Sequence, residues 1–402
     1  MSLTIVGQHD AQTIAQMRMC MQDERATAGV LCADGHYGYN HPVGGSIAYR
    51  DAISVSGVGF DIACGNMAIK TDVNARDLKP RDWQGLADKI RRTFSFGIGR
   101  VNAKSAEALP LDLSLFDDSA HVAWQIPFIA ALKAKARDQL GTIGSGNHYV
   151  DVFEADDGTV WVGNHFGSRG LGHAIATHYM EAAEAKGSHK PMHAPPVLLD
   201  AGSDLGRAYL VAMDLAGRYA YAGREWVARS VVRLLGGQVV DEVHNHHNFA
   251  WQEEVAGAPH WVVRKGATPL YPGQRGFVGG SMGDISVILR GVAHDQAEAM
   301  LNSTVHGSGR VMSRTQAAGK VRWVKGRQTR VTTGQVDEAA WRARLAAGGL
   351  ILIGAGADEM PEVYRPLRDV LACHANTCVV EEVLHPRIVA MAGADEFDPY
   401  KD

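Results

Sequence analysis

Short apolar segments alternate with glycine-rich loops along most of this 402-residue chain. Alternating or short apolar runs bounded by glycine are typical of strands, whereas apolar positions that recur every three to four residues predict amphipathic helices. On this basis we expect strands at 3–6, 28–33, 46–56, 67–71, 149–153, 161–162, 238–243, 261–263, 286–290 and 350–353. We expect helices at 10–24, 81–93, 119–140 with an interruption at Pro127, 173–186, 204–235, 337–346 and 358–372. No repeat, low-complexity segment or proline-rich linker is visible, so we expect one large domain over 1–402, with a loose C-terminal tail over 394–402.

The charge balance limits the classes of partner. The formal net charge is −4, whereas strong non-specific binding of nucleic acid usually brings a basic balance. Bulk charge therefore does not indicate a nucleic-acid substrate, although a local basic cleft could still hold one. Glycine is abundant, 45 of 402 residues, and it gathers in short loops where the backbone must turn sharply or approach a ligand.

Cysteine usage indicates the compartment. There are five cysteines, none in a CxxC pair, which makes a zinc ribbon an unfavoured reading. The odd count and the lack of a recognisable signal peptide favour a reducing cytosol, so we expect a cytoplasmic protein. No apolar run approaches the roughly 20 residues of a membrane-spanning helix, so no membrane partner is expected.

The most conspicuous chemistry is the stretch 244–248, His-Asn-His-His-Asn, which directly follows a predicted strand. A histidine cluster of this kind is a candidate metal site. The same residues could equally form a histidine-rich turn without a ligand, and the stretch alone does not decide between the two.

Two other loops pair side chains that could bind a metal. Asp61 and Cys64 lie three residues apart among glycines, and a carboxylate and a thiolate on one tight loop make a plausible ligand pair. A turn-forming aspartate and an inert buried cysteine would give the same spacing. Asp34 and His36 would share a face if that loop were extended, but an Asx turn beside an incidental histidine is the favoured reading of those residues alone.

Further glycine loops lie at 141–148, 163–170, 279–283 and 303–310; the first ends in histidine, the second and fourth carry histidine and arginine, and the third consists of small residues and a methionine. Backbone N–H groups in such loops, and at the helix start that follows residue 170, suit the oxyanions of phosphate. Taken together, the loops offer one thiolate, one carboxylate and three imidazoles as ligands: Asp61, Cys64, His148, His165 and His247. These could hold two divalent cations if the thiolate bridges them, which is a known arrangement for phosphoryl chemistry.

These segments resemble the RtcB family of RNA-splicing ligases. The matching motifs are GVGFDIACG (57–65), GTIGSGNH (141–148), HFGSRGLGH (165–173), HHN (246–248), RKGAT (264–268), GSMG (280–283), HGSGRVMSR (306–314) and DEMPEVY (358–364). They occur in order from about residue 30 to about residue 365. The resemblance implies an α+β fold, with mixed and antiparallel sheets in the core flanked by helices.

The resemblance also implies an activity: joining RNA ends that carry a 2′,3′-cyclic phosphate or a 3′-phosphate to 5′-hydroxyl ends, with GTP and two manganese ions, in RNA repair or tRNA splicing. His306 would attack the α-phosphate of GTP and form a histidine–GMP intermediate. Cys64 would bridge the metals, His148 and His165 would complete one site, and Asp61 and His247 the other. An accessory protein is possible, and the resemblance does not specify one.

By the same resemblance, nucleotide and phosphate would be held by Asn147, Asp151, Asn248, Gly280, Ser281, Met282, Gly283, Ser286, His306, Gly307, Ser308, Gly309, Arg310 and Tyr364. RNA contacts are expected from Asp34, His36, Arg169, Arg264, Lys265 and Arg314.

The chain departs from the family pattern at three places. Met391 stands where the family has a lysine near its C-terminus that touches the guanylate, and Asp151 stands where glutamate is usual. The first loop reads Ala-Asp-Gly-His at 33–36 rather than Pro-Asp-Val-His. These departures put guanine selectivity in question, whereas the metal ligands and His306 are retained.

Two other functions remain open. A metal-dependent phosphoesterase would open cyclic phosphate ends without nucleotidyl transfer, which the missing lysine favours and the intact His306 disfavours. A non-catalytic RNA- or nucleotide-binding protein would be expected to have lost His306 or Cys64, and neither is lost.

Strand parity refines the role of the histidine cluster. If 243–249 is extended, His244 and His246 share one face and His247 points to the other. The three cannot all reach one metal without a bend, and the resemblance to the family motif selects His247 as the ligand, with His246 behind it or at the substrate and His244 structural.

Overall fold

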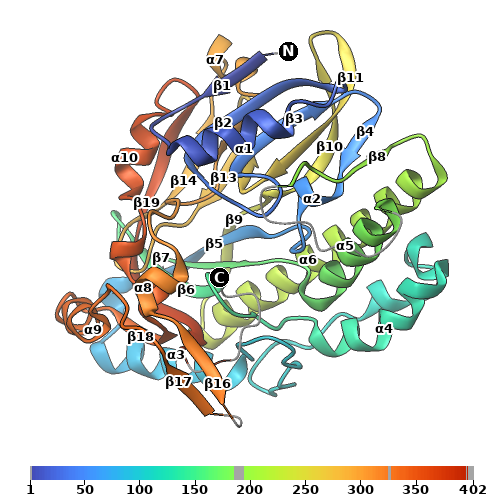
Figure 1. Cartoon of the computed structure of the whole chain (residues 1–402). Coiled ribbons are helices and arrows are strands. Elements are labelled where there is room, and N and C mark those ends of the chain that lie inside the picture. Colours follow the sequence, from blue (N-terminus) through green and yellow to red (C-terminus); the bar gives the residue numbers. More distant parts are fainter. Residues whose placement is uncertain (1, 185–193, 325–326, 395, 397–402) are drawn as a thin grey trace.

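The computed structural model describes residues 2–184, 194–324, 327–394 and 396, with side chains described outside 321–330. A mixed eight-stranded sheet forms its centre (Figure 1). The path across this sheet is β13 (Arg275–Val278), β14 (Ser286–Gly291), β19 (Cys378–Gly393), β6 (Tyr149–Ala155), β7 (Thr159–Phe166), β5 (Gly65–Asn74) and β9 (Val239–His246). Each neighbouring pair on this path is antiparallel, and β18 (Ile351–Ala355) adds a parallel pairing to β19.

A five-stranded sheet lies above the central sheet in the view of Figure 1. Its order is β1 (Ser2–Ile5), β2 (Ala26–His36), β3 (Val43–Tyr49), β11 (Ala258–Lys265) and β10 (Asn248–Val255). Only β1 and β2 pair in parallel. The chain passes from β9 in one sheet to β10 in the other through His247 alone. The histidine cluster therefore lies at the junction of the two sheets.

Two helices cover one face of the central sheet, α3 (Pro80–Thr93) and α6 (Asp204–Leu235). Trp83 and Ile90 of α3 and Val231 of α6 are buried in one cluster with strand residues such as Val162 and Ile388. The other half of α6 packs with α1 (Ala11–Cys20), α2 (Val55–Val58), α4 (Pro127–Gln139) and α5 (Arg169–Ala183) in a second cluster. α6 ends at Gly236, whose φ of +83° is the left-handed conformation that glycine adopts without strain.

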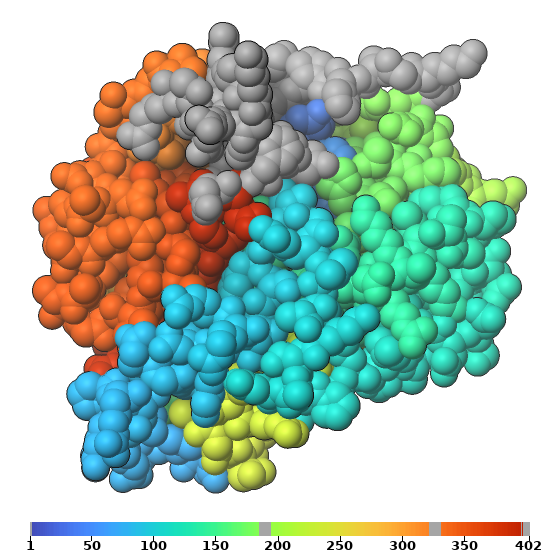
Figure 2. All heavy atoms as spheres, turned by 90° about the horizontal axis from the view of Figure 1, so that it is seen from below, coloured from blue at the N-terminus to red at the C-terminus, as the bar shows by residue number. Residues whose placement is uncertain are grey.

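The remaining elements are short and surround the two sheets. They are β4 (Ala52–Ser54), β8 (Leu198–Asp200), β12 (Ala267–Pro269), β15 (Ser303–Val305), β16 (Val321–Val324), β17 (Arg327–Arg330), α7 (Asp295–Ala299), α8 (Arg314–Ala318), α9 (Glu338–Ala347) and α10 (Leu367–Ala372). Seen from below, the cyan and turquoise part of the chain that contains α3 and α4 lies beside the orange part that contains α9 (Figure 2).

The predicted α+β class, with mixed and antiparallel sheets flanked by helices, is confirmed. The helix predicted at 204–235 has those bounds. Three expectations were wrong in detail. The strand predicted at 46–56 divides into β3, β4 and α2, and the helix predicted from 119 starts at Pro127 after a short turn of 3₁₀ helix. The helix predicted at 358–372 is broken by Pro361 and Pro366. Proline fits the start of a helix but disfavours a helical conformation in the residue before it, which explains the last two differences.

The predicted tail at 394–402 lies mostly outside the described residues. Within it, Glu396 is described and pairs with Arg100 at 2.5 Å. No helix among the described residues is long and apolar enough to cross a membrane.

Candidate functional site

Four strand ends meet at one edge of the central sheet. Because β6, β7, β5 and β9 alternate in direction, the starts of β6 and β5 lie beside the ends of β7 and β9. His165 is opposite Tyr149 on one side and Asn66 on the other, and Gly65 is opposite His246. The residues that adjoin these positions, Cys64, His148 and His247, therefore gather around His165.

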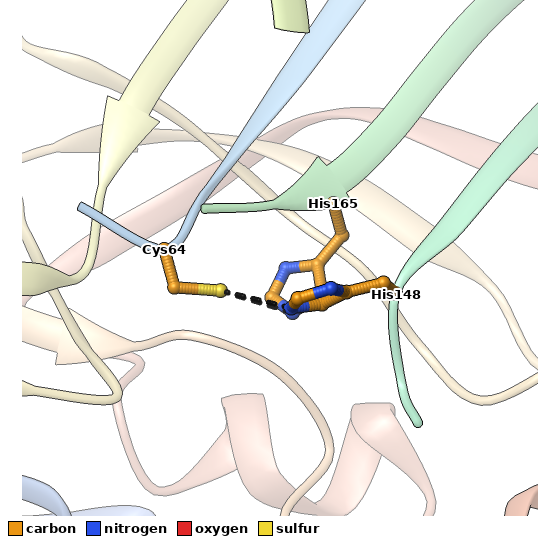
Figure 3. A group of neighbouring side chains, drawn as sticks. All are labelled: Cys64, His148 and His165. Atoms are coloured by element: carbon orange, nitrogen blue, oxygen red, sulfur yellow. Dashed lines mark hydrogen bonds between the residues drawn. The ribbon is translucent and has the colours of Figure 1, made fainter. Parts of the chain in front are cut away.

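Cys64, His148 and His165 converge on one point, as Figure 3 shows. The Cys64 Sγ atom lies 3.7 Å from His148 Nε2 and 3.6 Å from His165 Nε2. Metal–ligand bonds of about 2.0–2.3 Å place the ligand atoms of a tetrahedral site roughly 3.3–3.8 Å apart. The three buried side chains could therefore hold a metal ion.

Neighbouring groups fix which ring nitrogen of each histidine faces the cluster. His165 Nδ1 donates to the side-chain oxygen of Asn66 at 2.7 Å, and His148 Nδ1 donates to the Ile143 carbonyl at 3.0 Å. Arg169 Nη1 lies 3.2 Å from His148 Nδ1, but a nitrogen that donates to Ile143 cannot also accept from a guanidinium. Both Nε2 atoms thus keep their lone pairs for a metal, as in known histidine sites.

The carboxylate of Asp61 extends the cluster. Its Oδ2 atom lies 3.0 Å from His148 Nε2. Burial would raise the pKa of Asp61, but the hydrogen bond and charge that His148 supplies when its ring is protonated, with the charge of Arg169, lower it well below its usual range. Gly167 is required beside it, because a Cβ atom there would lie 2.2 Å from Asp61 Oδ1.

The remaining site groups differ in protonation. Burial, followed by the charge of Asp61, raises the pKa of the Cys64 thiol well above its usual value. Burial lowers the pKa values of His165 and His247 well below 6.5, so both imidazoles are neutral and able to act as ligands at neutral pH. A bound metal ion would instead favour the thiolate form of Cys64, because a coordinating thiol loses its proton.

His247 lies between the metal-ligand cluster and His306. Its ring centroid is 5.0 Å from that of His165 and 5.0 Å from that of His306. Its backbone N–H donates to the Cys64 carbonyl at 2.8 Å, and its buried Nδ1 atom has no hydrogen-bond partner among the described residues. The side chains of His244 and His246 lie on the face opposite that of His247, as expected from the sequence, and they point toward Arg224 on α6.

His306 follows β15 and is held by Asp34 of β2. Asp34 Oδ2 accepts from the backbone N–H of His306 at 2.9 Å and from its ring Nδ1 at 2.6 Å. The reading of Asp34 as part of an Asx turn was wrong, because the residue belongs to a strand. The expectation that Asp34 contacts RNA is also corrected, because its side chain is completely buried.

These groups open into a cavity of about 310 Å³, within the usual range for small-molecule sites. Its lining includes most residues expected from the sequence: His36, Asp61, Cys64, Asn147, His148, Asp151, His165, His247, Asn248, Lys265, Gly280, Ser281, Met282, His306, Gly307, Ser308, Gly309, Arg310, Arg314 and Tyr364. Gly283 and Ser286 are outside this lining. Ser286 instead accepts from the backbone N–H of Gly280 at 3.1 Å and so shapes the loop from behind.

The basic residues expected to contact RNA have different environments. Arg264 is completely buried and pairs with Glu253, Ser303 and the Leu301 carbonyl, so the expectation of an RNA contact there is wrong. Pairing of this kind offsets the cost of burying a charged side chain.

Arg314 and Arg310 line the cavity but are engaged by the chain itself. Arg314 pairs with Asp358 at 2.8 Å and also with Glu359, and Arg310 donates to the Tyr364 hydroxyl at 2.9 Å. Lys265 also lines the cavity; its Nζ donates to the Tyr39 carbonyl at 2.6 Å, and burial lowers its pKa to about 8.

His36 and Asp151 present polar groups to the cavity wall. Burial lowers the pKa of His36 to about 4, and its Nδ1 donates to the Asp34 carbonyl at 3.1 Å. Burial raises the pKa of Asp151 well above its usual range, and its Oδ1 has no partner among the described residues. Met391 lines the same wall, on the strand beside Asp151.

Reasoning from the sequence missed three residues that support the site. Asn66 directs the ring of His165, Tyr149 stacks on that ring at 5.5 Å, and Arg224 lies behind it. Asn66 and Tyr149 are each within two residues of a motif histidine or cysteine, so strand pairing could have suggested them. Arg224 lies inside a long helix, where no local signal marks it.

The site thus combines a buried cysteine–histidine cluster able to bind metal with a carboxylate-held histidine in one polar cavity. The family described as tRNA-splicing ligase RtcB matches residues 11–392, and the chain belongs to this RtcB family. RNA-splicing ligase RtcB of Escherichia coli (strain K12) is 31% identical over 306 residues, covering 71% of this chain and 74% of the relative. RNA-splicing ligase RtcB of Mycobacterium tuberculosis is 30% identical over 424 residues, covering 86% and 91%. tRNA-splicing ligase RtcB of Archaeoglobus fulgidus is 29% identical over 413 residues, covering 86% and 83%.

Proposed function

We propose that this protein is a GTP- and manganese-dependent RNA ligase. It joins RNA ends bearing a 2′,3′-cyclic phosphate or a 3′-phosphate to 5′-hydroxyl ends, through a histidine–GMP intermediate on His306. The observation that carries the proposal is the position of His306, which Asp34 holds through Nδ1 within one cavity with the metal-ligand cluster. Family membership and the names of the relatives support RNA ligation as the overall reaction.

The donor set fits the implied metals. Cys64 would bridge two ions, His148 and His165 would complete one site, and Asp61 and His247 the other; the unpartnered Nδ1 of His247 suits this role. Bound metals would offset negative charge on the phosphates during transfer. The ligands do not select manganese by themselves, since the intrinsic affinity order favours zinc.

His306 is the nucleophile. Because the Nδ1–H group donates a hydrogen bond to Asp34, the proton stays on Nδ1 and Nε2 carries the lone pair that attacks the α-phosphate of GTP. A phosphorus–nitrogen bond forms and pyrophosphate leaves. In the next step the RNA 3′-phosphate attacks the same phosphorus, which releases His306 and forms an RNA 3′ end joined to the 5′ position of guanosine through two phosphates. The 5′-hydroxyl then attacks the RNA phosphate, loses its proton and displaces GMP. A cyclic phosphate is first opened by water to a 3′-phosphate.

The cavity lining has groups suited to the nucleotide. Asn147, Asn248, Ser281 and the loop 307–310 would hold its phosphates through amide, hydroxyl and backbone N–H donors. Gly280, Met282 and Gly283 shape the neighbouring loop with Ser286. Asp151 and Tyr364 would contact the guanine, with Arg310 and Arg314 beside Tyr364.

RNA would be contacted by His36 and Lys265, which line the cavity, and by Arg169, which lies beside His148. We place the protein in the cytoplasm, and an accessory protein remains compatible with the proposal. A focused basic entrance would suit a chain of net charge −4, because only local charge then attracts the phosphates.

An end-joining assay tests the proposal. Labelled RNA with a 2′,3′-cyclic phosphate and a second RNA with a 5′-hydroxyl are incubated with the protein and manganese, with or without GTP. The proposal predicts a joined product only with GTP. Opening of the cyclic phosphate without GTP, and no joining with it, would identify a phosphoesterase instead. Binding of RNA without any change to its ends would identify a non-catalytic protein.

A further inference from the structure

Arg224, near the middle of α6, lies completely buried behind the metal-ligand cluster. Its Nη1 atom donates to the Phe166 carbonyl at 2.6 Å and to the Ala63 carbonyl at 2.8 Å. Phe166 directly follows His165, and Ala63 directly precedes Cys64. One nitrogen of one guanidinium therefore connects the two backbone segments that carry these ligands.

The other side of the guanidinium is engaged by the histidine cluster. Nε donates to His244 Nε2 at 2.9 Å, and Nη2 donates to His246 Nδ1 at 2.9 Å. A guanidinium can only donate, so both imidazoles accept and must be neutral. His246 Nδ1 also lies 3.2 Å from the Ala63 carbonyl, but an accepting nitrogen makes no hydrogen bond to another acceptor.

The surroundings of Arg224 are unusual for a buried cation. Among the residues that the structure describes, its hydrogen-bond partners are two carbonyls and two imidazoles, and its guanidinium lies 5.3 Å from the Tyr221 ring centre. A buried charge without a paired carboxylate is costly. The arrangement is therefore difficult to explain as ordinary core packing, which an apolar residue of similar volume would provide at lower cost.

The segment that Arg224 holds is strained. Ala63 has a φ of +59°, a left-handed conformation that is unfavourable for a residue other than glycine. Its N–H donates to the Asn248 carbonyl at 2.7 Å, so hydrogen bonds to both its N–H and its carbonyl hold this turn. The turn sets the position of the Cys64 side chain relative to His165.

We propose that Arg224 is a positioning residue that fixes the separation of the Cys64 turn from the His165 strand, and thereby the spacing of the metal ligands. The inference rests on the proposed metal site. It assigns to α6 a role beyond packing, because the helix supplies the guanidinium group that holds the Cys64 turn and the end of the His165 strand at a fixed distance from each other. Lysine cannot replace it, because an ammonium group does not span two carbonyls and two imidazoles in one plane.

Arg224→Lys tests this inference, with Arg229→Lys as the matched control. Arg229 lies on the same helix and pairs with Glu225 and Glu242 at the surface. Each purified protein, freed of metal, is titrated with Co²⁺ while the thiolate-to-cobalt absorption band is followed, and thermal unfolding is recorded separately. No RNA or GTP is needed, so the result does not depend on ligation.

We expect Arg224→Lys to fold, and to bind Co²⁺ at least tenfold more weakly than wild type, with a shifted thiolate band; groups behind metal ligands typically contribute about 10–100-fold. Arg229→Lys should match wild type. Equal affinity and an equal band in Arg224→Lys would overturn the inference while leaving the metal site intact. Failure of Arg224→Lys to fold would also overturn it, since the role would then be structural. A wild-type protein without a thiolate band would instead contradict the proposed metal site.

A double variant tests separately whether Arg224 acts by holding the strained turn at Ala63. Glycine adopts a φ of +59° without strain, so Ala63→Gly should let the Cys64 turn keep its shape when residue 224 makes fewer hydrogen bonds to it. We expect Ala63→Gly/Arg224→Lys to recover at least threefold in Co²⁺ affinity over Arg224→Lys. No recovery would contradict the part of the inference that concerns this turn.

Discussion

The carboxylate of Asp34 accepts two hydrogen bonds from His306, one from the backbone N–H and one from the ring Nδ1, at 2.9 and 2.6 Å. This pairing fixes both the position of the ring and its tautomer, with the lone pair on Nε2. Burial would raise the pKa of Asp34, but the charge that His306 has when its ring is protonated and the hydrogen bonds from its ring and backbone lower it, so the carboxylate remains ionised next to the ring.

Replacing Asp34 should therefore impair nucleotidyl transfer without removing the nucleophile. In Asp34→Asn the amide can present a donor to Nδ1 and favour the wrong tautomer. A comparable change in a serine-protease triad lowers the rate by about 10⁴-fold, and we expect a loss of roughly 10²–10⁴ here. The rate of covalent labelling by GTP is the measurement, with Co²⁺ affinity as the control that should not change. A labelling rate within threefold of wild type would show that Asp34 does not orient His306.

Asn66 orients the ring of His165 without being a proposed metal ligand itself, so its replacement tests the effect of ligand orientation alone. Its side-chain oxygen accepts from His165 Nδ1, and its side-chain nitrogen donates to the Phe277 carbonyl at 2.9 Å. Asn66→Ala should free the imidazole to rotate and weaken metal binding by about 10–100-fold. Asn376→Ala, at an exposed position, is the control. If Asn66→Ala bound metal as tightly as the control, the ring of His165 would have to be held by its packing alone.

Metal binding should release the proton of the Cys64 thiol. Burial and the nearby Asp61 charge keep the Cys64 thiol protonated at neutral pH, whereas Asp61 is ionised and the imidazoles of His165 and His247 are already neutral. Coordination requires the thiolate, so metal affinity should rise about tenfold per pH unit while the free thiol remains protonated, and fall as pH decreases. Co²⁺ titrations between about pH 6.5 and 8.5 measure this slope, and Cys64→Ser should flatten it. A flat profile in wild type would mean that the thiol does not ligate.

Met391 and Asp151 should together determine how well the cavity accepts guanine. They lie on paired strands, one diagonal step apart, and both line the cavity. Burial raises the pKa of Asp151 well above its usual range, which favours the neutral acid, a weaker acceptor for the guanine N–H groups than a carboxylate.

A lysine at position 391 would favour the ionised form of Asp151. We expect Met391→Lys to lower the KM for GTP several-fold and to raise the preference for GTP over ATP, whereas Met391→Leu should change neither. The measurement is the labelling rate at increasing concentrations of each nucleotide. An unchanged preference in Met391→Lys would place base recognition elsewhere in the cavity.

The sequence predicted the site residues that lie in local motifs, but not the contacts between residues on distant strands. Cys64, His148 and His165 lie at strand ends within glycine-rich motifs, so the local sequence pattern predicted them as candidates. The alternation of side chains along the strand separated His247 from its neighbours. The partnership of Asp34 with His306 spans strands far apart in the chain, and no local pattern reveals it. Arg264 was misread for a related reason: a basic residue beside glycine looks like a phosphate contact until Glu253 is found against it.

The fold was predicted in class but not in arrangement. The helix at 204–235 has a capping serine and a terminal glycine, which are local signals, so its bounds could be predicted. The order of strands in the central sheet depends on long-range pairing. β19, for example, pairs with β14, β6 and β18, which are separate in the sequence. Periodicity within one segment contains no information about such partners.

Covalent labelling by GTP tests the central claim most directly. The protein is incubated with manganese and α-labelled GTP, denatured, and analysed by mass spectrometry of its peptides. The account predicts one acid-labile GMP on His306, absent in His306→Ala, and discharged when RNA with a 3′-phosphate is added. An absence of label with GTP or any other nucleotide, in a protein shown to bind metal, would contradict it.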